Sequence, residues 1–175
     1  MGIKYRRESK MPYFYLTLCL IFLDQASKWF VQTKMFPMQS IDLIKGLFSI
    51  TYATNYGAAF GILQSQTLLL IAISLGVIIV VWINRRKINS YPRIMQAGLA
   101  VALGGAFGNL IDRIRLGFVV DFLNFSIWPI FNVADTAIVM GVGLILWGIF
   151  FNKAQNTQEQ QNTDITQNPI SGEEK

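Results

Sequence analysis

Residues 104–135 read GGAFGNLIDRIRLGFVVDFLNFSIWPIFNVAD, and this stretch decides how the whole chain is interpreted. Among its polar residues are three aspartates, two asparagines and two arginines, within some of the most apolar sequence of the chain: Asp112, Asp121, Asp135, Asn109, Asn132, Arg113 and Arg115. A charged residue inside a bilayer costs roughly 2.5–3.5 kcal/mol on insertion scales. Charges at a membrane interface would explain one or two of these aspartates. Three of them, with two asparagines and two arginines, indicate a functional site.

The sequence on both sides of this stretch has the composition of a membrane protein. Of its 175 residues, 53% are hydrophobic and only 14% are charged. The net charge is +5, but the Lys and Arg residues cluster beside apolar runs. That pattern indicates membrane orientation, so we expect no nucleic-acid partner.

The chain contains no histidine, which excludes Ser-His-Asp and Cys-His catalytic sites and removes the commonest metal ligand. Its single cysteine, Cys19, cannot form an internal disulfide. Acid–base chemistry must therefore use Asp, Glu, Lys or Tyr. We expect neither a metal nor another cofactor.

Four apolar segments are long enough to cross a membrane as helices. They cover approximately residues 13–31, 67–84, 94–111 and 132–151. The sequence therefore predicts an all-α membrane protein with a four-helix transmembrane domain over residues 1–151. Residues 152–175 are rich in Gln, Asn, Thr and Glu, which predicts a disordered cytoplasmic tail.

Two connections between these helices have features of their own. Residues 41–45 and 47–53 are rich in Ile, Leu, Phe, Thr and Tyr, with Gly46 between them. They predict a small extracytoplasmic β element between helices one and two. Residues 113–131 are too short and too mixed to span, and they predict an interfacial segment between helices three and four.

Basic residues orient the helices. Eight of the 15 Lys and Arg residues lie at the N-terminus and in the loop after the second helix: Lys4, Arg6, Arg7, Lys10, Arg85, Arg86, Lys87 and Arg93. The positive-inside rule makes these regions cytoplasmic, so both termini are expected inside. Counting about 1.5 Å per helical residue then brings a set of polar groups to one level near the outer interface. They are Asp24, Asn55, Asn109, Asp112, Asp121 and Asp135.

Two carboxylates that share a water molecule form a complete hydrolytic device without histidine. Close together, they cannot both ionise easily, so one stays protonated. The ionised group takes a proton from water as it attacks a carbonyl, and the protonated group donates to the carbonyl oxygen.

Other kinds of protein are alternatives. A transporter or channel would spread ionisable groups across the bilayer depth, and a non-catalytic scaffold would not need paired aspartates. A Ser/Lys hydrolase could use Ser27 with Lys28, or Lys45 with Ser49. Neighbouring helical residues point apart, however, and a loop lysine is a poor buried base.

Several of the polar residues also have a purely structural explanation. Asp112 next to Arg113 could form an ion pair that closes the third helix. Asp24 and Lys28 are spaced to pair along one helix. Asn55 could cap a turn.

Five ordered motifs resemble those of the bacterial lipoprotein signal peptidases, also called signal peptidase II, which are four-helix membrane aspartic peptidases. The motifs are DQASK (24–28), NYGAAF (55–60), GGAFGNLIDR (104–113), VVDF (119–122) and FNVAD (131–135). The resemblance covers approximately residues 13–151. Tyr56, where the family often has Thr, is the one variation among the key positions.

The resemblance implies that Asp121 and Asp135 are the catalytic pair. It implies a further set of residues that line or support the site: Asp24, Asn55, Asn109, Arg113, Asn132 and Ala134. The implied substrates are prolipoproteins, cleaved on the amino side of a diacylglyceryl-modified cysteine. The implied location is the bacterial cytoplasmic (inner) membrane with the site near the outer face. Membrane lipid and the cyclic peptide inhibitor globomycin are the other implied partners.

Overall fold

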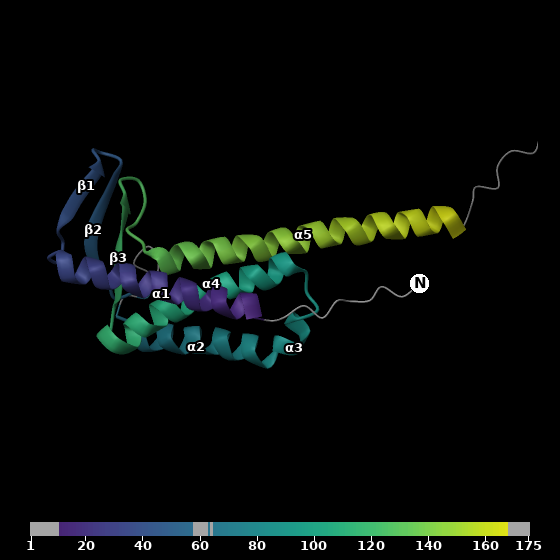
Figure 1. Cartoon of the computed structure of the whole chain (residues 1–175), viewed down its shortest axis with the longest axis horizontal. Coiled ribbons are helices and arrows are strands. Elements are labelled where there is room, and N and C mark those ends of the chain that lie inside the picture. The colour runs from purple at the N-terminus through teal and green to yellow at the C-terminus, as the bar shows by residue number, and fades with distance from the viewer. Residues whose placement is uncertain (1–10, 58–62, 64, 168–175) are drawn as a thin grey trace, which may run out of the picture.

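The computed structural model describes residues 11–57, 63 and 65–167 (Figure 1). Its elements are α1 (Met11–Lys34), β1 (Ser40–Ile44), β2 (Phe48–Asn55), α2 (Thr67–Ile83), α3 (Arg85–Ile88), α4 (Arg93–Leu116), β3 (Val119–Phe125) and α5 (Val133–Gln167). Three helical segments in this part of the chain are long and apolar enough to cross a membrane: Tyr13–Lys34, Arg93–Leu116 and Val133–Phe151. The apolar helix α2 is shorter than these three.

The long helices lie side by side, and the small sheet sits across one end of the bundle (Figure 1). Helix α4 is central, because it contacts α1, α2 and α5. The protein is therefore mostly helical, with a three-stranded sheet at one end.

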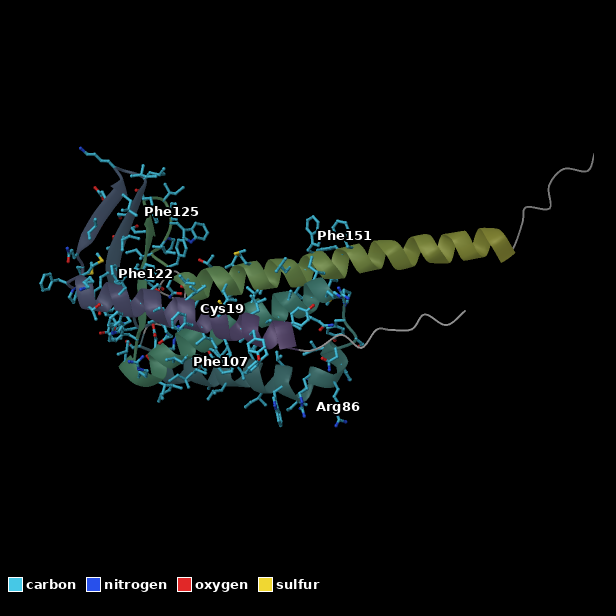
Figure 2. All side chains as sticks on the ribbon, in the orientation of Figure 1. Cys19, Arg86, Phe107, Phe122, Phe125 and Phe151 are labelled. Carbon is cyan, nitrogen blue, oxygen red and sulfur yellow. The ribbon has the colours of Figure 1, made fainter. Side chains whose placement is uncertain are left out.

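The helices carry their large apolar side chains on the outside of the bundle (Figure 2). Phe22, Trp82 and Val139 are 70%, 64% and 72% exposed, respectively. Lipid would solvate such a surface, whereas water would not. Between the helices small residues allow close packing, as at Gly98 of α4, where an added Cβ would lie 2.7 Å from the carbonyl oxygen of Gly141.

Gly105 is the tightest of these contacts and gives a direct test of the packing. A Cβ there would collide with the carbonyl oxygen of Ala134 and lie 2.8 Å from Ile138 Cγ1. We expect Gly105→Ala to destabilise the protein by about 1–3 kcal/mol, because α4 and α5 would have to separate. Gly143→Ala on α5 is the matched control, since nothing lies within 4 Å of its added Cβ. Thermal unfolding in one detergent compares the two, and equal melting temperatures would contradict the tight contact.

Helix α4 ends five residues beyond the predicted limit of 111, at Leu116. Gly117 follows in the left-handed conformation with φ 80°, and its N–H donates to the Arg113 carbonyl at 3.1 Å. Such a glycine ends a helix and redirects the chain. Here it turns the chain into β3.

The sheet confirms the β element predicted between the first two helices and adds a third strand from the segment that follows α4. Its strand order is β1-β2-β3, with both pairs antiparallel. Residues 113–131 were predicted as an interfacial segment, but they contain the end of α4 and the strand β3. The partner of β3 is β2, in which Ala53 lies opposite Asp121. This pairing joins segments that are far apart in sequence, so local pattern does not reveal it.

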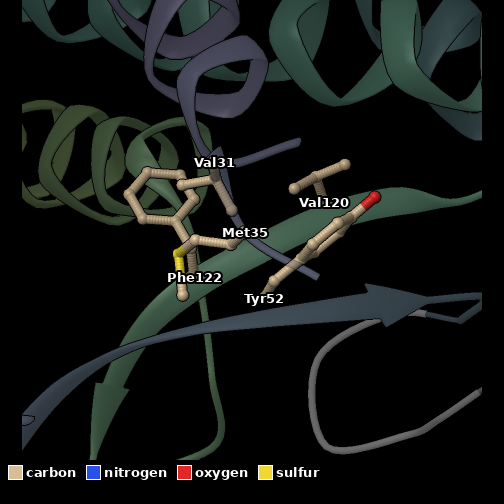
Figure 3. Packing of buried hydrophobic residues seen from close by; sticks show 5 residues of the cluster. All are labelled: Val31, Met35, Tyr52, Val120 and Phe122. Atoms are coloured by element: carbon tan, nitrogen blue, oxygen red, sulfur yellow. The ribbon is translucent and has the colours of Figure 1, made fainter. Parts of the chain in front are cut away.

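A buried apolar cluster fixes the sheet onto the end of α1 (Figure 3). Its members are Val31 of α1, Met35 directly after α1, Tyr52 of β2, and Val120 and Phe122 of β3. Val120 and Phe122 point to one side of β3, and the alternation of strand side chains sends Asp121 to the other side. The cluster therefore determines which way Asp121 faces.

Helix α5 differs from the prediction at its distal end. The sequence predicts that the helix ends near residue 151 and that a disordered tail follows. The structure continues α5 to Gln167, past the ends of the other helices (Figure 1). Residues 168–175 of the predicted tail lie outside the described residues.

Candidate active site

Asp135 lies in the first turn of α5 and is held there by a capping box. The side-chain oxygen of Asn132 accepts from the Asp135 N–H at 2.9 Å, and Asp135 Oδ2 accepts from the Asn132 N–H at 3.3 Å. This reciprocal arrangement satisfies two N–H groups that the start of a helix leaves unpaired. The same start presents the positive end of the helix dipole to the Asp135 carboxylate.

Asp121 lies on β3, buried, and both of its oxygens accept hydrogen bonds from asparagine side chains. Asn132 Nδ2 donates to Oδ1 at 2.6 Å, and Asn55 Nδ2 donates to Oδ2 at 2.9 Å. Asn55 also accepts the Gly57 N–H at 2.9 Å, so it caps a turn and contacts the carboxylate at once. Asn132 contacts both aspartates and therefore fixes one relative to the other.

The pKa of Asp121 is raised from 3.8 to about 7. Burial is the largest cause and the nearby charge of Asp135 is the second, while the amides of Asn55 and Asn132 and the charge of Lys28 partly oppose the rise. Near neutral pH Asp121 is therefore partly protonated. Two carboxyl groups that interact in this way share their protons as a pair.

This raised pKa has a consequence for folding. The folded protein binds the Asp121 proton more tightly than the unfolded chain does. The stabilisation that protonated Asp121 gives to the fold is therefore complete below 3.8, the pKa of this group in the unfolded chain. It is lost as the pH rises from there through about 7, the pKa in the folded protein. Relative to Asp121→Asn, we expect wild-type protein to lose on the order of 2–3 kcal/mol of stability between about pH 5 and about pH 8.

Thermal melting of both proteins across that range measures this difference. Asparagine presents an N–H₂ group where Asp121 accepts, which shifts the variant's stability at every pH. The test is therefore how the difference in stability between the two proteins changes with pH, and not the size of that difference at any one pH. Parallel melting curves for the two proteins would contradict the raised pKa.

Lys28 of α1 is buried against α4, and its ammonium group contacts three of the polar residues. Its Nζ lies 2.8 Å from Asp24 Oδ2 and 3.1 Å from Asp112 Oδ2, and it donates to Asn109 Oδ1 at 2.9 Å. Three acceptors match the three N–H bonds of an ammonium group. Asn109 Nδ2 in turn donates to Asp135 Oδ1 at 2.7 Å. The ionic cluster is therefore connected to Asp135.

The remaining predicted residues also meet here. Asp24 Oδ1 accepts the N–H of Ala134 at 2.9 Å, which fastens the start of α5 to α1. Arg113 Nη2 donates to the Gly57 carbonyl at 3.0 Å. The expected ion pair between Arg113 and Asp112 does not form. Asp112 instead accepts from Gln25 Nε2 at 2.9 Å and from the Val120 N–H at 3.1 Å, besides pairing with Lys28.

The structure does not support the alternative that the chain is a Ser/Lys hydrolase. Ser27 Oγ donates to the Asp24 carbonyl at 2.8 Å, and the three donors of Lys28 are engaged elsewhere. Lys45 is exposed, whereas Ser49 is buried.

A cavity of about 1100 Å³ contains both aspartates. Its wall is polar near Asp121 and Asp135 and apolar along α5. The lining residues are Thr54, Asn55, Tyr56, Ser65, Asn109, Arg113, Val119, Asp121, Trp128, Pro129, Ile130, Phe131, Asp135, Thr136, Ile138, Val139 and Met140. The exposed apolar side chain of Val139 continues this wall onto the lipid-facing surface of α5.

Sequence analysis missed the contact of Lys28 with Asn109 and the role of Asp112. A signal for both exists. Asp24 and Lys28 are four residues apart, and Asn109 and Asp112 are three apart, so each pair lies on one helix face. Two such polar faces on apolar helices are stable only if they meet each other.

The fold and this cavity define a class of protein: a membrane enzyme with two carboxyl groups in a largely apolar cavity at one end of a helical bundle. The chain belongs to the signal peptidase II family, and the family model matches residues 16–151. It is therefore a peptidase by family.

Individual relatives agree with this assignment. The chain is 40% identical over 149 residues to the lipoprotein signal peptidase of Moorella thermoacetica, covering 85% of this chain and 99% of the relative. It is 46% identical over 132 residues to that of Halothermothrix orenii, covering 75% and 90%. It is similar to a bacterial membrane enzyme solved in meso at 2.3 Å, with TM-score 0.75, 29% identity and coverage of 93% and 94%. A second such structure, at 1.9 Å, gives TM-score 0.71, 32% identity and coverage of 78% and 91%.

Proposed function

We propose that this chain is an aspartic endopeptidase that removes signal peptides from prolipoproteins, cleaving on the amino side of the diacylglyceryl-modified cysteine. One observation carries the proposal. Asp121 and Asp135 lie in one cavity, and an N–H group donates to each of their four carboxyl oxygens. The chain offers no histidine for the same task.

The mechanism needs one proton shared by the pair. The ionised carboxylate takes a proton from a water molecule, whose oxygen attacks the scissile carbonyl carbon. The protonated partner donates to the carbonyl oxygen, which gives a neutral tetrahedral diol. Collapse of the diol returns the shared proton and moves one proton to the departing amine, so the C–N bond breaks and the pair is restored.

Other cavity residues would hold the substrate. Arg113 presents a guanidinium to the cavity and can donate to a backbone carbonyl of the signal peptide. Asn55, Asn109 and Asn132 keep the aspartates in place. The apolar wall along α5 suits the acyl chains of the lipid-modified cysteine, so lipid and peptide would enter together from the bilayer. A globomycin-type cyclic peptide would compete for this cavity.

We further propose that α1, α2, α4 and α5 all span the bacterial cytoplasmic membrane, within a domain of residues 1–151. Helix α2 has 17 residues and a length of about 26 Å, close to the hydrocarbon thickness. Arg86 lies at the end of the bundle opposite the sheet, so the basic end would be cytoplasmic (Figure 2). Both termini would then be inside, the sheet and the cavity would be near the outer face, and residues 152–175 would form a cytoplasmic tail.

Single-cysteine labelling tests this orientation. In a Cys19→Ala background, a membrane-impermeant thiol reagent applied from outside should modify Ile127→Cys and spare Asn89→Cys. Both positions are exposed, so burial does not decide the result. Permeabilised cells provide the control, in which both positions should react. Labelling of position 89 alone in intact cells would reverse the orientation.

The activity itself is tested with purified protein and a diacylglyceryl-modified prolipoprotein in bilayers. We expect release of the intact signal peptide and a mature product whose first residue is the modified cysteine. Cleavage at any other bond, or none with the folded protein, would contradict the proposed function.

A further inference from the structure

Three asparagines present their N–H₂ groups to the two aspartates, and each is oriented by a group that can only donate. The Asn55 oxygen accepts the Gly57 N–H at 2.9 Å, and the Asn132 oxygen accepts the Asp135 N–H at 2.9 Å. For these two, the backbone determines which end of the amide faces the carboxylate. A reversed amide would set N–H against N–H.

Asn109 has no such backbone donor, and Lys28 takes that place. Lys28 Nζ donates to Asn109 Oδ1 at 2.9 Å, and Asn132 Nδ2 donates to the same oxygen over the longer distance of 3.2 Å. Because an ammonium group cannot accept a hydrogen bond, Asn109 must present its oxygen to Lys28 and its Nδ2 to Asp135 Oδ1, at 2.7 Å.

We propose that Lys28 is a positioning residue for the reaction, which acts by fixing the amide orientation of Asn109 and so directing an N–H donor at Asp135. This inference rests on the proposed function of the Asp121–Asp135 pair. Lys28 does not line the cavity and would not touch the substrate.

A purely structural role is the alternative, because Lys28 also neutralises Asp24 and Asp112 and joins α1 to α4. Lys28→Met alone does not separate the two roles, since it leaves two buried carboxylates without their cation. A matched pair of triple variants does. Both carry Asp24→Asn and Asp112→Asn, and they differ only in having Lys28→Gln or Lys28→Met.

The two triple variants have the same charge and similar side-chain length at position 28. The glutamine has an N–H₂ donor for Asn109 Oδ1, and the methionine has none. The charged groups that remain around Asp135 are the same in both proteins: Asp121 and Arg113. A difference in rate therefore reports the donor and not the buried ion pairs.

The measurement is the pH–rate profile on diacylglyceryl-modified prolipoprotein, per folded enzyme, with wild type and Asp135→Asn in parallel. We expect the Gln variant to turn over about tenfold faster than the Met variant, with KM within about twofold. The pH–rate profiles of the two variants should also differ, because the Asp121–Asp135 pair would lose an oriented N–H donor in the Met variant.

The controls separate failure of this inference from failure of the proposed function. An active wild type and an inactive Asp135→Asn establish the proposed function. Given that result, equal rates and equal profiles for the two triple variants, or equal loss of all turnover, would overturn the positioning role. A difference only in melting temperature would also overturn it.

Discussion

Replacement of Asp121 or Asp135 by asparagine should lower the rate of prolipoprotein cleavage by at least roughly 10²–10⁴-fold. An amide cannot take a proton from water or give one to a carbonyl oxygen, so either substitution removes half of the proposed acid–base pair. The loss should appear in kcat, because neither aspartate is proposed to contribute to lipid binding. Initial rates with saturating modified substrate measure it.

The control for this experiment is Asp42→Asn. Asp42 is an exposed aspartate on β1 of the same sheet, outside the cavity lining, and its substitution should leave the rate within about twofold. The asparagine variants should still purify as folded, inserted protein, since neighbouring helices hold the cap and the strand. If Asp121→Asn or Asp135→Asn turned over within tenfold of the wild-type rate, the substituted aspartate would not belong to the proposed catalytic pair.

A substrate without its diacylglyceryl group should be cleaved orders of magnitude more slowly than the modified one with the same peptide sequence. Each acyl CH₂ that is buried contributes about 0.8 kcal/mol, so a few of them already change binding a hundredfold. The apolar wall formed by Ile138, Val139 and Met140 is where we expect this burial.

A side-by-side comparison in one bilayer composition measures this dependence, and shortened acyl chains make it quantitative. Substrates with intermediate chain lengths should give intermediate values of kcat/KM. Equal rates with and without the lipid would mean that the enzyme recognises only the peptide. In that case lateral entry along α5 would have to be abandoned.

Sequence alone predicted the apolar helices well, because their length and composition are local properties. The predicted start of the third helix at residue 94 lies one residue from the observed start of α4 at Arg93. Strand β3 was not predicted, because its stability comes from pairing with the distant strand β2, as between Ala53 and Asp121. The polar setting of Asp121 depends on that pairing.

The candidate site was predicted as a set of residues and not as a network. Asp24, Asn55, Asn109 and Asn132 do meet around the two aspartates. Their roles followed from the resemblance to a family, which gives positions but no hydrogen bonds. The expected pairing of Asp112 with Arg113 was wrong because consecutive helical residues point about 100° apart, and Asp112 faces α1 instead.

The capping box of α5 also determines whether the connection between β3 and α5 can change in length without moving the two aspartates. Asp135 takes its position from the first turn of its own helix, and Asp121 takes its position from the strand. The bridge between Leu123 and Phe131 closes the connection below its tip, where Ile127 is 90% exposed. Residues could therefore be inserted or deleted at this tip without changing the separation of the two carboxyl groups. Because Trp128 and Pro129 line the cavity, a reporter peptide in a working enzyme belongs beside Ile127, ahead of these two residues.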